Sequence, residues 1–207
     1  FNGIHEGLVQ SWKDIFPKKG EIHFAGALEN NEDTGTLQYL ASTAMEAGFS
    51  TRVLDMQALD LQNGRFFDPA GELVNRCFKL YPWEWMVDES PDGCLAEMEW
   101  LEPIWKLVMS NKAILATLYE LFPDSPYVLP CYLSRPRSGL FCKKPIFSRE
   151  GHNVSVVDIR DWEEYVRIAE TEGDYNTGAY VYQEYVEPTA YSGRYPVIGS
   201  WIIGGEA

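Results

Sequence analysis

The sequence has few of the cysteines and histidines that build zinc sites, and it lacks long apolar runs. The four cysteines are Cys77, Cys94, Cys131 and Cys142. They show no C-x-x-C spacing and the three histidines are scattered singly, so we expect no zinc site. No stretch of about eighteen apolar residues occurs, and the start carries no signal-peptide or lipidation motif, so we expect no membrane anchor. The cysteines read as reduced thiols, and we expect a cytoplasmic protein.

Basic residues are also scarce. The chain has 17 Lys and Arg against 31 Asp and Glu, which gives a formal net charge of -14. A field of this sign repels phosphate backbones and anionic lipid surfaces, so a nucleic-acid or membrane partner is not expected. With 207 residues and 45% hydrophobic content, the chain can bury a sizeable core in one large or two small domains. Repeats and low-complexity tracts are absent.

The first part of the chain predicts a β-α-β unit. A helical pattern over 1–16 ends before Pro17 and is followed by a strand over 21–28, a helix over 36–47 and a strand over 50–56. Such a unit usually has a right-handed crossover in a parallel sheet. The turn at 29–35 has no G-x-G-x-x-G, and its acids would repel a phosphate, so we interpret it as an acidic helix start and not as the dinucleotide site of an oxidoreductase.

A hairpin and an acidic run follow. Strands at 65–67 and 73–80 flank a turn at 68–71. The aromatic cluster at 81–86 is typical of core packing or of a joint between subdomains. Acids accumulate from Asp88 to Glu102, which indicates either a solvated face or attraction for a cationic substrate.

The second part of the chain is rich in predicted strands. A helix capped by Ser110 or Asn111 ends at Pro123, and Lys112 in its first turn opposes the helix dipole unless it reaches solvent or an anionic partner. The expected strands are 127–133, 139–146, 152–157, 179–186 and 197–203, with one helix over about 161–172. Strands interrupted by a single helix indicate an α+β subdomain that follows the α/β part.

One turn and one later strand carry the main functional signal. Lys143 and Lys144 lie on an expected strand that ends in a turn with Ser148, Arg149 and Gly151. Strand cations and the backbone N–H groups of a glycine turn can point at phosphate oxygens, and the arginine fork fits a phosphoryl group better than lysine does. Further along the chain, the expected strand at 182–186 has two polar side chains and an apolar face. A nucleotide held between two β elements requires such a strand. The combination points to ATP, and a charged hairpin with its lysines in water is the alternative.

Five motifs, spread over most of the chain, carry a family resemblance. They are residues 79–86 (KLYPWEWM), 110–115 (SNKAIL), 144–151 (KPIFSREG), 182–186 (YQEYV) and 196–201 (PVIGSW). In this order they resemble the glutathionylspermidine synthase family, whose synthetase domain has an ATP-grasp fold. The resemblance implies an ATP-grasp-like fold of α/β and α+β class. A β-α-β pre-ATP-grasp part over 1–109 would precede a strand-rich subdomain over 110–207 that carries the nucleotide lid.

The resemblance also implies an activity, that of an ATP-dependent carbon–nitrogen ligase. In this family ATP phosphorylates a peptide carboxylate, that of glutathione in the namesake enzymes. An amine such as spermidine then attacks the acyl phosphate to give an amide, ADP and phosphate. Catalysis of this kind is mostly positioning and charge neutralisation. We therefore expect ATP and Mg²⁺ as cofactors, and a glutathione-like peptide and a polyamine as small-molecule partners.

Roles for individual residues follow from the motifs of the resemblance. Lys112 and Lys144 would contact the nucleotide phosphates, and Arg149 would be the catalytic residue that stabilises the transferred phosphoryl group and the acyl phosphate. The residues expected to shape a mobile lid turn are Ser148, Glu150 and Gly151. Those expected to line the adenine pocket, with backbone groups reading the base, are Gln183, Glu184, Tyr185 and Val186. Lys143 is interpreted as a flanking charge.

The sequence departs from the family pattern at both ends. We expect the magnesium-binding acids and much of the glutathione site to lie upstream of residue 1, and another nucleotide-contacting basic residue to lie beyond residue 207. As a piece of a longer protein, the chain alone would be inactive or a partial nucleotide binder. No Cys/His arrangement replaces the amidase domain that accompanies some members. Two alternatives stay open: a ligase with another peptide or amine substrate, and a non-catalytic nucleotide-binding remnant.

Overall fold

The computed structural model describes residues 3–161, 164–175 and 178–205 of the chain. It divides into two compact units, one formed by Phe1–Lys106 with Ile198–Ala207 and the other by Leu107–Val197. The sequence predicted a division at residue 110 with everything after it in the second part, whereas the structure groups the last segment with the first unit. Within the described ranges, no helix is both long and apolar enough to cross a lipid bilayer.

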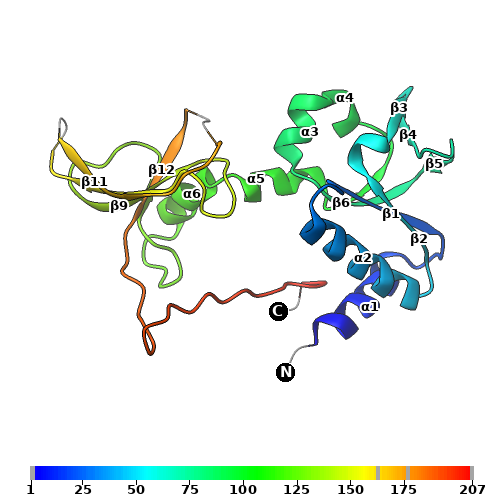
Figure 1. Ribbon diagram of the computed structural model, residues 1–207, viewed down its shortest axis with the longest axis horizontal. Coiled ribbons are helices and arrows are strands. Elements are labelled where there is room, and N and C mark those ends of the chain that lie inside the picture. The colour runs from blue at the N-terminus through cyan, green and yellow to red at the C-terminus, as the bar shows by residue number, and fades with distance from the viewer. Residues whose placement is uncertain (1–2, 162–163, 176–177, 206–207) are drawn as a thin grey trace. The chain divides into compact units, whose positions relative to one another are not determined.

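The described part of the first unit contains four α-helices, a parallel sheet and a small antiparallel sheet (Figure 1). Its elements are α1 (Ile4–Ile15), β1 (Glu21–Gly26), α2 (Asn31–Glu46), β2 (Ser50–Asp55), η1 (Met56–Ala58), β3 (Asp60–Gln62), β4 (Arg65–Phe67), β5 (Leu73–Val74), β6 (Arg76–Leu80), α3 (Trp83–Glu89), α4 (Pro91–Cys94), β7 (Glu99–Leu101) and η2 (Ile104–Lys106). The parallel sheet has the order β2-β1-β6-β7, and β3-β4-β5 form the antiparallel one.

The predicted β-α-β unit is confirmed. β1 and β2 pair in parallel, and α2 connects them. Asn30 begins the helix because its side chain accepts a hydrogen bond from the Glu32 amide at 2.9 Å, and Glu32 and Asp33 lie in the first turn, where the helix dipole favours acids. Gly48, with a φ of +95°, allows the chain to turn into β2.

The core of the first unit lies between the helices and one face of the parallel sheet. Ile22 and Phe24 on β1 are fully buried, and Leu37 and Ala44 of α2 meet them in the same cluster. Trp12 of α1 packs edge-on against Phe24, with ring centroids 5.7 Å apart. Alternation along β1 therefore directs these apolar side chains to the helices. Figure 1 shows α1 and α2 next to the strands β1 and β2.

The predicted hairpin forms, but its second strand divides in two. The Asp68 carboxylate accepts hydrogen bonds from the amides of Ala70 and Glu72, each at 2.9 Å, and this closes the turn between β4 and β5. β6 then leaves the hairpin and pairs with β1 in the parallel sheet. In the aromatic segment that follows, Trp83 is buried, so core packing is confirmed there.

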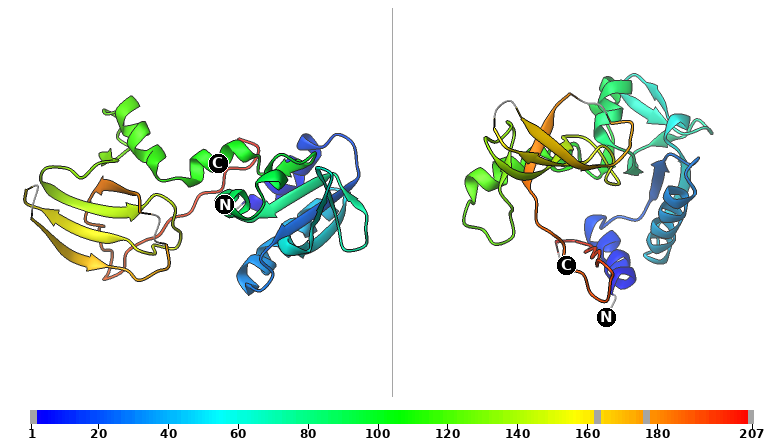
Figure 2. Two further views of the ribbon diagram at one scale, coloured as in Figure 1. Left: turned by 90° about the horizontal axis from the view of Figure 1, so that it is seen from above. Right: turned by 60° about the vertical axis from the view of Figure 1, so that its left-hand side comes forward.

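The second unit is a five-stranded sheet with helices (Figure 2). Its elements are α5 (Leu107–Ser110), α6 (Ala113–Leu121), β8 (Cys131–Tyr132), β9 (Gly139–Pro145), β10 (Ser155–Ile159), β11 (Tyr165–Glu170) and β12 (Tyr180–Glu184). The strand order is β11-β10-β9-β12-β8, and every pair is antiparallel.

The helix predicted over 161–172 is wrong for the residues that the structure describes. Tyr165–Glu170 form β11, which pairs with β10, while 162–163 lie outside the described residues. Tyr165, Val166 and Ile168 are aromatic or β-branched, which suits a strand, and the open edge of β10 supplies the hydrogen-bonding partners. Pairing with β10 thus outweighs the helix-like spacing of apolar residues in this segment.

Other predicted strands are shorter, shifted or missing. Residues 197–203 were expected to form a strand, but Val197 and Ile198 are 97% and 88% exposed. Ile203 instead packs on the core of the first unit. The strand expected at 127–133 is reduced to β8, and the one at 152–157 is moved to β10, because regular pairing begins only at Ser155.

Two faces of the second sheet are distinguished by what covers them. Partners in an antiparallel pair share a face, so Lys144, Val181 and Gln183 lie on one side, which we call the α6 face because Val181 packs with Ala116 of α6. Lys143 and Tyr182 lie on the other side, which we call the opposite face.

Candidate nucleotide site

The start of α6 meets the turn after β9. Lys112 is the N-cap of α6, and its backbone N–H donates to the Ile146 carbonyl at 2.8 Å. Its ammonium donates to the Ser148 hydroxyl at 2.8 Å and also to the Ser148 carbonyl. Since Ser148 is only 8% exposed, these bonds fix the lysine against the turn. Two of the predicted ATP-binding residues are thereby in direct contact.

A second contact joins two predicted residues on the α6 face. The Lys144 ammonium of β9 donates to the Gln183 side-chain carbonyl of β12 at 2.6 Å. Cys131 and Cys142 flank Gln183 in the register of the three strands. Burial raises the pKa of both thiols, and the charge of Lys144 acts against that rise. Lys144 is therefore held by a neutral partner next to two thiols that stay protonated near neutral pH.

The turn that carries Arg149 is tied to the segment after β11. Glu150 and Gly151 have φ angles of 54° and 71°, a left-handed conformation that favours glycine. The Thr171 hydroxyl donates to the Gly151 carbonyl, and the Asn153 side chain accepts from the Tyr175 amide at 2.8 Å. These bonds fix one end of the turn, while Ser148 fixes the other.

The predicted adenine-binding segment uses part of its backbone inside the fold. The amides of Glu184 and Tyr185 donate to the carbonyls of Pro130 and Leu140, at 2.8 and 3.0 Å. In the described part of the chain, the amide of Val186 has no such acceptor, and Val186 is 56% exposed. Of the backbone N–H groups of these three residues, that of Val186 is the one left to donate to a base.

The described residues offer little for the metal that the resemblance implies. They contain no group of three His, Cys, Asp or Glu side chains that could hold an ion. The acidic run after β6 is also partly neutralised. Glu97 and Glu99 pair with arginines, Arg65 and Arg76, each at 2.9 Å, and Glu102 pairs with Lys106. Of the two interpretations of that run, attraction for a cationic substrate is the less supported.

The motif at 79–86 contains a buried cation that sequence reasoning did not single out. Lys79 is 5% exposed, and its ammonium donates to the Tyr81 carbonyl at 2.6 Å and lies 3.8 Å from the Trp83 ring centroid. Burial lowers the pKa of Lys79 to about 8. The Trp83 indole donates to the Glu102 carbonyl at 3.2 Å, so this motif joins β6 to the segment after β7.

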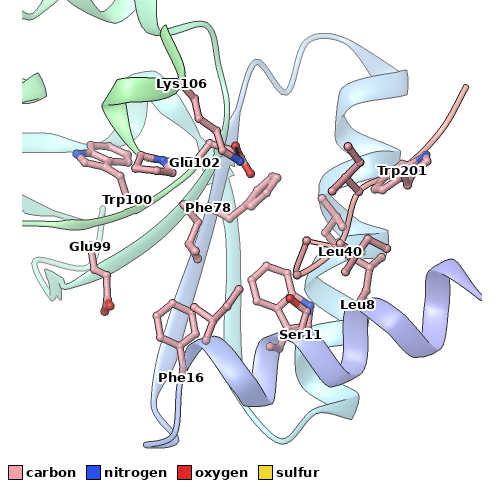
Figure 3. Close-up of a pocket in the computed structure, with 18 residues that line it drawn as sticks. Leu8, Ser11, Phe16, Leu40, Phe78, Glu99, Trp100, Glu102, Lys106 and Trp201 are labelled. Atoms are coloured by element: carbon pink, nitrogen blue, oxygen red, sulfur yellow. Dashed lines mark ion pairs between the residues drawn. The ribbon is translucent and has the colours of Figure 1, made fainter. Parts of the chain in front are cut away.

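A groove of about 650 Å³ in the first unit was also not predicted. Leu8, Ser11 and Phe16 follow α1 along one side, and Glu102 and Lys106 lie across from them (Figure 3). Apart from that ion pair at its edge, the lining is mostly apolar. The sequence carries no local signal for this groove, because its tryptophans, Trp12, Trp100 and Trp201, lie far apart in the chain.

Comparison with known proteins identifies a family and several relatives of this chain. Residues 1–207 match the family described as glutathionylspermidine synthase preATP-grasp. A Haemophilus influenzae protein named as an acid–amine ligase is 33% identical over 219 residues, which cover 100% of this chain and 56% of that protein. The trypanothione synthetase of Crithidia fasciculata is 27% identical, over 89% of this chain and 32% of its own length.

A third relative has two activities in its name. The bifunctional glutathionylspermidine synthetase/amidase of Escherichia coli is 27% identical over 240 residues, which cover 99% of this chain and 38% of that protein. The chain thus spans roughly a third to a half of the length of these relatives.

Proposed function

Because the chain belongs to the glutathionylspermidine synthase pre-ATP-grasp family, we propose that the protein is an ATP-dependent carboxylate–amine ligase. The γ-phosphoryl group of ATP passes to a substrate carboxylate, and ADP leaves. The amine nitrogen then attacks the acyl carbon, phosphate leaves, and the amine loses a proton, so the products are an amide, ADP and phosphate. The relatives, named as a ligase and as synthetases, support this reaction class.

The bond between Lys144 and Gln183 is the observation that carries the proposal. An amide carbonyl at 2.6 Å positions the ammonium without cancelling its charge, as a carboxylate would. Lys144 therefore keeps a full charge for a phosphate on the α6 face, and Lys112 adds a second cation at the start of α6.

The remaining predicted residues take separate roles in the proposed site. Val186 offers its backbone N–H to the base, since the amides of Glu184 and Tyr185 already have acceptors. Arg149 meets the transferred phosphoryl group, because a guanidinium donates to two oxygens of one group at once. Ser148 and Gly151 support Arg149 from either side of the turn.

Magnesium belongs to the proposed reaction, but not to the described residues. When bound, Mg²⁺ would supply positive charge that offsets the negative charge of the ATP phosphates during transfer. The described residues provide no set of ligands for it. We assign its ligands to sequence that the longer relatives have in addition.

The proposal is tested by ATP binding and by ADP release in the protein with its native flanking sequence. We expect Lys144→Ala to weaken ATP binding about tenfold or more, because a charge-assisted contact is lost. Arg149→Ala should leave ATP affinity within a few-fold and reduce ADP release by about a hundredfold or more, as loss of a preorganised charge does. Lys13→Ala removes an exposed lysine on α1 and serves as the matched control. Unchanged ATP affinity in Lys144→Ala would refute the assigned phosphate site.

The substrates are proposed from the relatives alone. Glutathione and a polyamine such as spermidine are the first pair to test, and other peptides and amines form the rest of a panel. ADP release that depends on both substrates identifies the pair. Tight ATP binding without ADP release from any pair would instead identify a non-catalytic nucleotide-binding protein.

A further inference from the structure

The opposite face of the second sheet gathers cations and tyrosines that the proposed reaction does not use. Neighbouring residues on a strand point to opposite faces, so Lys143 lies across β9 from Lys144. Its ammonium is 3.9 Å from the ring centroid of Tyr180. Arg135, in the segment between β8 and β9, reaches the same face: its guanidinium is 4.9 Å from the Tyr165 ring centroid and donates to the Asp161 carbonyl at 2.9 Å.

A cavity lies between these two cations. It measures about 100 Å³ and is lined by Arg135, Lys143, Val157, Ile159, Tyr165 and Tyr182. A further cavity of about 380 Å³ shares Arg135 and Tyr182 with it and includes Tyr180. The floor is apolar and packed, since Val157 and Ile159 are 1% and 2% exposed and belong to a hydrophobic cluster of this unit. The cations therefore flank a preformed space.

The charges around the cavity are not balanced by the described residues. Neither Arg135 nor Lys143 forms an ion pair with any residue in the described ranges, although the chain carries a net charge of -14. The Nε–H of Arg135 is buried and has no acceptor within the described ranges. A buried donor without an acceptor is costly, and two neighbouring cations repel each other, so an acceptor with negative charge is what this space lacks.

We propose that this cavity binds a tetrahedral oxyanion, namely a phosphate group. Its oxygens accept from the Arg135 Nε–H and from the Lys143 ammonium, and the apolar floor keeps water away from these bonds. The smaller cavity has about the volume of three water molecules in the liquid, which suits one phosphate group but no nucleotide. The adjoining cavity has room for an organic group esterified to the phosphate. The smaller cavity is separate from the proposed ATP site, because Lys144 points to the other face, whereas the adjoining cavity extends to Ala113 and Ile146 beside Lys112.

The test follows the side-chain N–H of Arg135 by NMR. In the ¹⁵N-labelled 207-residue chain, the Arg135 Nε–H signal is assigned by its loss in Arg135→Gln, and inorganic phosphate is then added. We expect this signal to shift in a saturable manner, with an apparent Kd in the millimolar range or below. Lys143→Gln should weaken the binding about tenfold or more, because a charge-assisted hydrogen bond is lost. Arg137→Gln, an exposed position two residues from Arg135, is the matched control and should bind as the parent does.

Two further arms identify the ligand and separate this site from the ATP site. Phenyl phosphate binding more tightly than inorganic phosphate would show that the site takes a phosphate ester, and equal affinity would show that it takes free phosphate. Lys144→Gln should leave the Arg135 signal and its titration unchanged, whatever it does to ATP. The proposal is overturned if phosphate does not move the Arg135 signal, or if Lys143→Gln and Arg137→Gln behave alike. A Lys143→Arg variant that restores binding shows that loss in Lys143→Gln reflects charge and not misfolding.

Discussion

The Lys144–Gln183 bond allows a charge to be placed next to Lys144, the lysine that we propose contacts the ATP phosphates, without a change of shape. Gln183→Glu replaces the amide that accepts from Lys144 at 2.6 Å by a carboxylate of the same size. The lysine then has an internal ion pair, and a phosphate must compete with it. We expect ATP binding to weaken while the fold is retained.

The size of the effect follows from the distance. At 2.6 Å, two unit charges attract by about 1.6 kcal/mol in a water-like dielectric and by about 6 kcal/mol at an effective dielectric constant of about 20. Lys144 is half-buried, so the true value lies between these limits. The lower figure alone corresponds to a factor of about fifteen, so we expect the Kd for ATP to rise by about fifteenfold or more.

The assay is calorimetric titration of ATP with Gln183→Met as the control. Methionine has a similar length but neither charge nor carbonyl, so it removes the hydrogen bond and leaves the lysine unpaired. The Kd of Gln183→Met for ATP should rise by less than about fivefold, because only one hydrogen bond that orients the lysine is lost and no opposing charge is added. The difference between the two variants should shrink in high salt. If Gln183→Glu binds ATP as well as Gln183→Met does, Lys144 does not meet the phosphates.

Three further predictions concern stability. Burial lowers the pKa of Lys79 from 10.5 to about 8, so between these pH values the unfolded chain keeps a proton that the native state has released, and stability rises with pH. Lys79→Met should abolish this pH dependence of the free energy of unfolding, measured with urea. Near neutral pH it should stabilise the protein by at most about 3 kcal/mol, and the lost contact with the Trp83 ring reduces that gain. Burial lowers the pKa of His23 below its ordinary 6.5. As the pH falls below 6.5, the unfolded chain therefore binds a proton before the native state does, and the free energy of unfolding decreases. His23→Leu should remove this decrease when urea unfolding is measured across that pH range. Thr43→Val leaves the buried Trp12 indole N–H, now 2.9 Å from the threonine hydroxyl, without an acceptor and should cost about 1–3 kcal/mol; a loss below about 0.5 kcal/mol would contradict this.

The sequence predicted elements best where local signals and tertiary packing agree. The β-α-β unit has an N-cap at Asn30, helical apolar spacing and a glycine at 48, and all three features appear in the structure. The segment now in β11 has no such caps, and its strand exists because β10 presents an open edge. Pairing between distant segments is invisible in local spacing, and the helix prediction failed for that reason.

The candidate site was predicted as a set of residues but not as an arrangement. Motif order placed Lys112, Lys144 and Ser148 in the site, yet the bonds that fix them depend on the contact of α6 with the turn after β9 and on the register of β9 with β12. The cavity beside Arg135 could not be foreseen, because Arg135 and Tyr165 come together only once the sheet has formed.

Strand β9 explains why the lysine pair in the sequence does not act as one basic patch. Lys143 and Lys144 are adjacent in the chain, but strand alternation sends them to opposite faces, each among different partners. A ligand on either face bonds to the same strand, and that strand leads directly into the turn that carries Arg149. Because Ser148 and Thr171 hold this turn at both ends, a displacement of β9 cannot be absorbed by a loose loop and must reach Arg149. Phosphate on the opposite face should therefore alter ADP release through the position of Arg149, and Lys143→Gln should remove that effect while leaving the activity without phosphate intact.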